Sequence, residues 1–169
     1  MTRKLALAAI CLAALTVIGY AQKKPDFSGT WALDAAATAV ANGVAAPADA
    51  KAPTADNNMV IKHTAEMLTV QRKGPSGLQT FNYPLDGKEH EVTAGRMTMK
   101  VTSKWDGDKL ALDITRLLGD GQTVVTTTSI YSLDPAGKLV LENKQPNGSR
   151  FIVYKRAEAA KQGSKVPGF

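Results

Sequence analysis

From Met59 onward, apolar and polar residues alternate with a period of two, and turn residues interrupt the alternation at short intervals. A period of two is typical of β-strands that bury one face. With an earlier strand around Trp31, the pattern predicts about ten strands. They cover residues 27–33, 59–63, 67–72, 78–85, 89–93, 96–105, 109–118, 122–133, 138–144 and 150–156.

Every connection after Asn58 is short, with turn pairs such as Asp86-Gly87 and Asn147-Gly148 between strands. Short hairpins place sequence neighbours side by side, so the chain is expected to form an up-and-down antiparallel meander. A long open meander exposes two strand edges, and pairing of the first and last strands removes them. We therefore predict an all-β fold of about eight to ten strands, closed into a barrel, in a single domain spanning residues 22–156.

Residues 34–58 form an Ala- and Pro-rich insertion between the first two strands. Asp34 can cap the start of a helix in the alanine run, and Asn42-Gly43 can end it. The part after Gly43 shows no period, and a connection of this length is either a lid over an opening or a tolerated insertion. At the other end, residues 157–169 are expected to form a flexible basic tail.

The first 21 residues have the features of an export signal. Arg3 and Lys4 precede an uncharged apolar run, and small residues follow it at Gly19 and Ala21. We expect cleavage near Ala21 and a periplasmic or extracellular mature protein, because the run is too short for a membrane span.

Composition narrows the function classes further. The single cysteine, Cys11, leaves with the leader, so the mature chain has no thiol. The full sequence has a formal charge of +6, which falls to +4 in the mature chain with the loss of Arg3 and Lys4. The cations are scattered, so we expect no nucleic-acid partner. The chain carries no hydrolase, metalloprotease or phosphate-loop motif. Its two histidines, His63 and His90, do not by themselves make a tight transition-metal site in a mature chain without cysteine. We therefore expect no catalytic residue, no metal and no cofactor.

Alternation also indicates which side chains face the barrel interior. On several strands, the apolar face ends in a polar or cationic group, as with Arg72 after Leu68 and Val70. One interpretation is an apolar cavity that ends at an anion-anchoring patch. The other is that these groups reach solvent at the rim. The interior candidates for ligand binding are Arg72, Phe81, Tyr83, His90, Met99, Ser103, Arg116, Thr127 and Tyr131.

Short motifs give the chain a resemblance to a known superfamily. They are Gly29-Thr30-Trp31 in the first strand, Trp105-Asp106-Gly107-Asp108-Lys109-Leu110 in a late hairpin, and Asn147-Gly148 before a last strand that contains Tyr154-Lys155-Arg156. This pattern resembles the calycins, which include lipocalins and fatty-acid-binding proteins. The short hairpins and threonine-rich strands are also similar to those of small secreted bacterial lipocalin-like domains.

The resemblance implies a calycin-like barrel with a structural plug at one end. Gly29 and Trp31 would form that plug, with Lys155 or Arg156 over the Trp31 ring in a cation–π contact. The carboxylate clamp of fatty-acid-binding proteins, an Arg-x-Tyr on the last strand, is not matched, because Ile152 stands two residues before Tyr154.

Three functional hypotheses follow. The first is a secreted, non-enzymatic, monomeric barrel that binds a small, largely apolar or amphipathic molecule, with an anionic group as an option. The second is a structural or protein-interaction module of the cell envelope with a filled interior. The third is an unrecognised enzyme.

Overall fold

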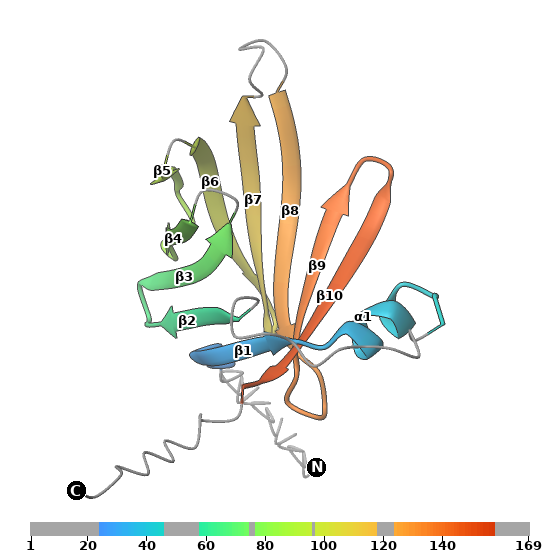
Figure 1. Cartoon of the computed structure of the whole chain (residues 1–169). Coiled ribbons are helices and arrows are strands. Elements are labelled where there is room, and N and C mark those ends of the chain that lie inside the picture. The colour runs from blue at the N-terminus through green and yellow to red at the C-terminus, as the bar shows by residue number, and fades with distance from the viewer. Residues whose placement is uncertain (1–23, 46–57, 75–76, 96, 118–123, 158–169) are drawn as a thin grey trace, which may run out of the picture.

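The computed structural model describes residues 24–45, 58–74, 77–95, 97–117 and 124–157 (Figure 1). Within them, the chain forms ten strands and one short helix. Their bounds are β1 Gly29–Leu33, α1 Ala35–Ala41, β2 Met59–His63, β3 Met67–Gly74, β4 Gly77–Pro84, β5 Glu89–Ala94, β6 Met97–Asp106, β7 Lys109–Leu117, β8 Val124–Leu133, β9 Leu139–Gln145 and β10 Gly148–Arg156. The all-β prediction is confirmed. The expected signal peptide, part of the insertion (46–57) and the tail after Ala157 lie outside the described residues.

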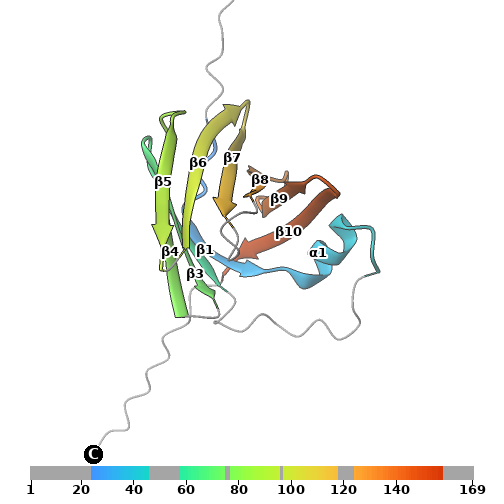
Figure 2. The same cartoon turned by 90° about the horizontal axis from the view of Figure 1, so that it is seen from above.

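The strands form one antiparallel sheet in the order β4-β3-β2-β1-β10-β9-β8-β7-β6-β5. Sequence neighbours pair except β4 and β5, which the Asp86-Gly87 turn was expected to join as a hairpin. Strand β1 joins the two ends of the meander by pairing with both β2 and β10. Figure 2 shows the sheet curving around an interior, with β4 and β5 brought close together. The predicted meander and the pairing of the first and last strands are confirmed.

Closure is nearly complete but stops between β4 and β5, which form the two ends of the hydrogen-bonded sheet. The connection between them bonds to other parts of the chain. The Leu85 amide donates to the Glu66 carbonyl at 2.8 Å, and the Gly87 amide donates to the Ser103 hydroxyl at 3.3 Å. These bonds satisfy backbone groups at the turn without a β4–β5 ladder.

We call the end where β3, β5, β7 and β9 finish the mouth, and the opposite end the base. Large buried side chains fill the base. Trp31, Phe27, Leu110 and Leu139 have no exposed surface. The Phe27 ring also stacks on Trp105, with centroids 6.1 Å apart. Close packing at this end gives the sheet its hydrophobic core.

Trp31 is held at the edge of its ring by a hydrogen bond and over one face by a cation. Its Nε1–H donates to the Phe27 carbonyl at 2.9 Å, and the Arg156 guanidinium lies 4.5 Å from the ring centroid. Gly29 has a φ of 144°, and a side chain there would collide with the Arg156 guanidinium. Arg156 therefore covers the ring, while Lys155 points away and is exposed.

The helix expected after the first strand is α1, capped by Asp34 and ended at Asn42. It lies beside β10 beyond the end of β1 (Figure 1). Thr38 bonds the backbone of Val153, and Asn42 bonds the backbone of Phe151. Two side chains thus replace a strand neighbour along this part of β10. Among the described residues, no helix has both the length and the apolar character needed to cross a bilayer.

Candidate ligand-binding site

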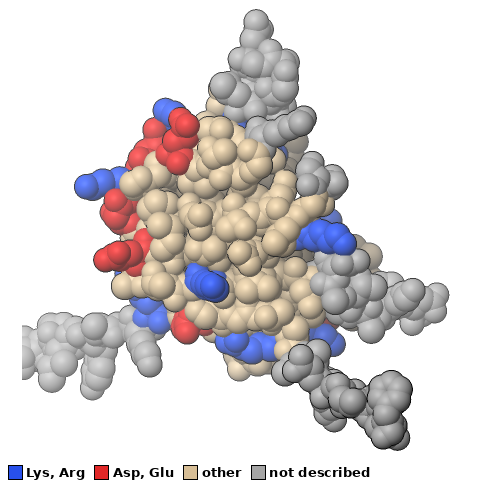
Figure 3. All heavy atoms as spheres, turned by 60° about the vertical axis from the view of Figure 1, so that its left-hand side comes forward, with Lys and Arg blue, Asp and Glu red and all other residues tan. Residues whose placement is uncertain are grey.

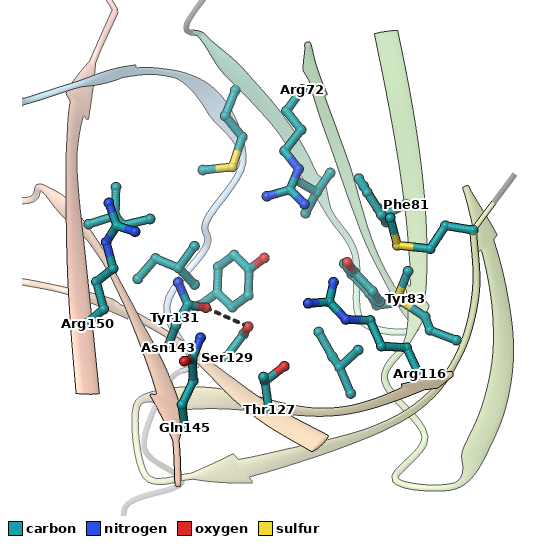
Figure 4. Close-up of a pocket in the computed structure, with 17 residues that line it drawn as sticks. Arg72, Phe81, Tyr83, Arg116, Thr127, Ser129, Tyr131, Asn143, Gln145 and Arg150 are labelled. Carbon is teal, nitrogen blue, oxygen red and sulfur yellow. Dashed lines mark hydrogen bonds between the residues drawn. The ribbon is translucent and has the colours of Figure 1, made fainter. Parts of the chain in front are cut away.

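The mouth half of the barrel encloses a cavity of about 250 Å³ (Figure 4). One part of its wall is apolar, and another part carries hydrogen-bonding groups. The apolar part consists of Met59, Val70, Phe81, Met97, Met99, Ile114, Leu141 and Ile152, and the polar part of Tyr83, Thr127, Ser129, Tyr131, Asn143 and Gln145. Three arginines, Arg72, Arg116 and Arg150, complete the lining.

The arginines come from three well-separated strands, β3, β7 and β10. In the order of the sheet, β3 and β10 are three strands apart, and so are β10 and β7. Each arginine stands within two residues of the mouth end of its strand. They therefore lie around the cavity near the mouth. Figure 4 shows the guanidinium groups of Arg72 and Arg116 reaching toward its middle and that of Arg150 on another wall.

Among the described residues, no Asp or Glu lines this cavity, and none forms an ion pair with these arginines. All three side chains are exposed. The Arg72 guanidinium lies 4.9 Å from the Phe81 ring centroid, a cation–π contact that fixes its direction. The site thus presents three cations to one space without a protein counter-charge.

Two tyrosines add neutral donors to this space. Burial raises the pKa of Tyr83 to about 12 and also raises the pKa of Tyr131, while the charge of Arg72 opposes both shifts. Both phenols therefore keep their protons near neutral pH. Their hydroxyl groups point into the cavity (Figure 4).

Apart from Tyr83 on β4, the polar part of the lining lies on β8 and β9, with β10 beside them. We call this part on β8 and β9 the polar wall. Ser129 pairs with Asn143 in the β8–β9 register, and its hydroxyl donates to the Asn143 side-chain oxygen at 2.8 Å. That bond uses one lone pair of the oxygen, and the amide N–H₂ group of Asn143 can donate to a ligand. Like the arginines, this wall therefore offers donors.

A second, more open depression lies at the base and holds a titratable group. Its lining includes Lys24, His63 and Trp105, and the Lys24 ammonium lies 4.8 Å from the Trp105 ring centroid. His63 Nδ1 accepts a bond from the Phe27 amide at 3.4 Å. Burial lowers the pKa of His63, and the nearby charge of Asp26 opposes this shift. His63 is therefore a neutral acceptor that joins the segment before β1 to β2.

Comparison with known proteins concerns the fold. No protein-family model matches the chain, and no curated protein matches it. A mutant of the fluorescent protein UnaG aligns with a TM-score of 0.53 at 22% identity, over 79% of this chain and 97% of that chain. The fatty acid transporter REP1-NXSQ aligns with a TM-score of 0.52 at 18% identity, over 78% of this chain and 96% of that chain. Both alignments show that this chain shares the barrel fold of these proteins. The barrel fold implied by the resemblance to calycins is thereby confirmed.

Seven of the nine interior candidates line the cavity of the barrel. They are Arg72, Phe81, Tyr83, Met99, Arg116, Thr127 and Tyr131. The other two lie outside the lining. Ser103 is buried and bonds the Gly87 amide, and His90 Nε2 lies 2.9 Å from an Asp86 carboxylate oxygen. Alternation gives the face of a residue but not its depth along the barrel, and both residues sit beyond the cavity.

Arg150, Asn143 and Gln145 line the cavity but are not among the ligand-binding candidates named from the sequence, although alternation places Asn143 on the same face as Leu139 and Leu141. A signal for Arg150 was present, because it shares a strand face with Ile152 and Tyr154. The β9–β10 register places it opposite Asn143. That register follows from the Asn147-Gly148 turn, so hairpin pairing could have brought the two residues together before the structure did.

Proposed function

We propose that this calycin barrel binds a small amphipathic anion in its mouth cavity and performs no chemistry on it. The observation that carries the proposal is the convergence of Arg72, Arg116 and Arg150 on a space with an apolar wall and no acidic lining residue among those described. Ligand sites commonly combine an apolar body with a few orienting polar groups. The fatty acid transporter of similar fold supports a ligand with an apolar tail and a carboxylate.

The distribution of charge on the outer surface supports the same proposal. On the face shown in Figure 3, the described Lys and Arg side chains are dispersed, and acidic side chains gather along one edge. The three arginines, by contrast, line one cavity, where the apolar wall lowers the local dielectric and strengthens the attraction for an anion. A cavity of about 250 Å³ also favours binding over the alternative of a filled interior.

Export of the protein is part of the proposal. The leader in residues 1–21 would deliver the barrel to the periplasm or the medium, where it would act as a monomeric carrier or scavenger.

Titration of the purified chain beginning at Gln22 with a fluorescent apolar carboxylate, and with its neutral methyl ester, tests the proposal. We expect the acid to bind more tightly than the ester. In the triple variant R72M/R116M/R150M, the acid should lose at least about tenfold in affinity, because a hydrogen bond to a charged group contributes about 1.5–3 kcal/mol. The ester should bind the variant and the unsubstituted protein about equally.

A matched control removes three cations from the outer face. Lys62, Lys104 and Lys109 are exposed and alternate with inward-facing residues. K62M/K104M/K109M changes the net charge equally, so it should leave the affinity for the acid within about twofold. Equal loss in both triple variants would mean that net charge, and not the cavity, governs binding. Failure of both probes to bind the unsubstituted protein would refute the proposed function.

A further inference from the structure

The number and spacing of the cavity arginines point to a specific class of head group. We infer that the ligand carries a dianionic head, either a phosphomonoester or two neighbouring carboxylates, held at the mouth with its apolar tail toward the base. This inference deepens the proposed function and rests on it.

Charge balance is the first argument. One carboxylate carries one negative charge, and three guanidinium groups face the cavity with no acidic side chain among its described lining residues. A monoanion would leave two of the three positive charges uncompensated as the ligand displaces solvent from them. A dianion leaves one, so the desolvation cost of binding is better offset.

Geometry is the second argument. A carboxylate has two oxygens in one plane, which suits a single arginine fork or two adjacent donors. Here the donors come from three strands spaced three apart in the sheet, and Figure 4 shows them on different walls. A phosphate presents three terminal oxygens in three directions, and paired carboxylates present four. Both match donors that approach from three sides.

The polar wall completes the set of donors. The Asn143 amide can donate to a ligand while its oxygen accepts from Ser129, and Tyr131 keeps its proton. The Gln145 side chain lies two residues nearer the mouth on the same face of β9. These neutral donors can satisfy the lone pairs that three arginines leave free on a dianionic head.

The residues that flank each arginine on its strand determine the orientation of the ligand. Two residues toward the base from Arg72, Arg116 and Arg150 lie Val70, Ile114 and Ile152, and all three of these apolar residues line the cavity. A head group at the arginines therefore places its tail against them. The cavity volume of about 250 Å³ lies below the roughly 300–1,000 Å³ of drug-sized sites, which favours a short tail.

Calorimetric titration with four probes that share an octyl tail tests the inference. The probes are octyl phosphate, octylmalonate, octanoate and octanol. At about pH 8, where a phosphomonoester with a second pKa near 6 is a dianion, octyl phosphate should bind at least about tenfold more tightly than octanoate. Octanol should bind most weakly. Octylmalonate separates the two dianions: affinity matching octyl phosphate indicates charge alone, and weaker binding indicates phosphate geometry.

The pH dependence of the preference provides an internal control. At about pH 5 the phosphate head is mainly a monoanion, so the ratio of octyl phosphate to octanoate affinity should fall severalfold. Any effect of pH on the barrel itself acts on both probes and largely cancels in the ratio.

Single substitutions complete the test. R72M, R116M and R150M should each weaken octyl phosphate by about fivefold or more, while at least one of them leaves octanoate within about twofold. K62M should change neither. Octanoate binding as tightly as both dianions at about pH 8 would overturn the inference and leave the proposed function standing. If no anionic probe binds more tightly than octanol, the proposed function itself fails.

Discussion

Replacing Trp31 by alanine tests whether the base of the barrel is the structural centre of the fold. The side chain has no exposed surface, and truncation of a buried Trp costs about 3–5 kcal/mol. The lost Nε1–H bond to the Phe27 carbonyl adds about 1 kcal/mol, and the lost contact with Arg156 adds about 0.5–1 kcal/mol. We expect a loss of about 4.5–7 kcal/mol in the free energy of unfolding. Domains of this size have about 5–15 kcal/mol in total, so Trp31→Ala should fold marginally or not at all.

Two milder substitutions keep the test quantitative. Trp31→Phe retains most of the ring but removes the bond to Phe27, so it should cost about 1–3 kcal/mol. Arg156→Met removes the cation–π contact and should cost about 0.5–1 kcal/mol. Urea unfolding followed by far-UV circular dichroism gives all three values, and Trp105 fluorescence reports the Trp31 variants independently. If Trp31→Ala unfolds within about 1 kcal/mol of the unsubstituted protein, the ring does not organise the base.

Three further predictions concern other parts of the chain. The double variant Thr38→Ala/Asn42→Ala removes four hydrogen bonds to β10, so it should lower the unfolding free energy by about 2 kcal/mol and speed amide exchange along β10. Val40→Ala, on the exposed face of α1, is the control and should change neither quantity. The pKa of His63 is lowered in the folded state, so the unfolded chain takes up a proton at a higher pH, and the stability contribution that is full above about pH 6.5 should decline as pH falls through the folded pKa. His63→Gln should reduce the difference between melting temperatures measured at about pH 7.5 and 5.5. An unchanged difference would exclude His63 as the cause. Mass spectrometry of the secreted protein should find Gln22 at or near its N-terminus, and an intact leader would contradict the export proposal.

The strand pattern was predictable because nearly every strand buries one face. Alternation located each strand to within about two residues; for β8, the predicted range 122–133 compares with the observed Val124–Leu133. The Asp106-Gly107 and Asn147-Gly148 turns fixed two of the hairpins, whereas the strands on either side of Asp86-Gly87 do not pair. Hairpin topology left closure between β1 and β10 as the way to cover the edges. The gap between β4 and β5 was not predictable, because it depends on bonds from their turn to Glu66 and Ser103.

The interior face of the last strand could not be predicted from alternation. Strand β10 carries apolar residues on both faces, so a period of two could not say which face is interior. The structure resolves this, because Ile152 packs against the interior cluster, whereas Val153 is buried on the opposite face, where α1 packs. A short helix with few apolar residues gave no sign that it would cover a strand. Arg150 was overlooked for this reason.

The two halves of the barrel separate stability from binding. At the base, Trp31 and Leu110 are fully buried, so substitutions there act on the fold. At the mouth, Arg72, Arg116 and Arg150 are exposed and have no ion pair within the described residues, so replacing them removes mutual repulsion and leaves no carboxylate unpaired. Arg116→Met and Arg150→Met should therefore leave the unfolding free energy within about 0.5 kcal/mol or raise it. Arg72→Met also loses the cation–π contact with Phe81, so it should stay within about 1 kcal/mol. A loss of ligand affinity in these variants can then be assigned to the chemistry of the site, because the barrel that carries it is unchanged.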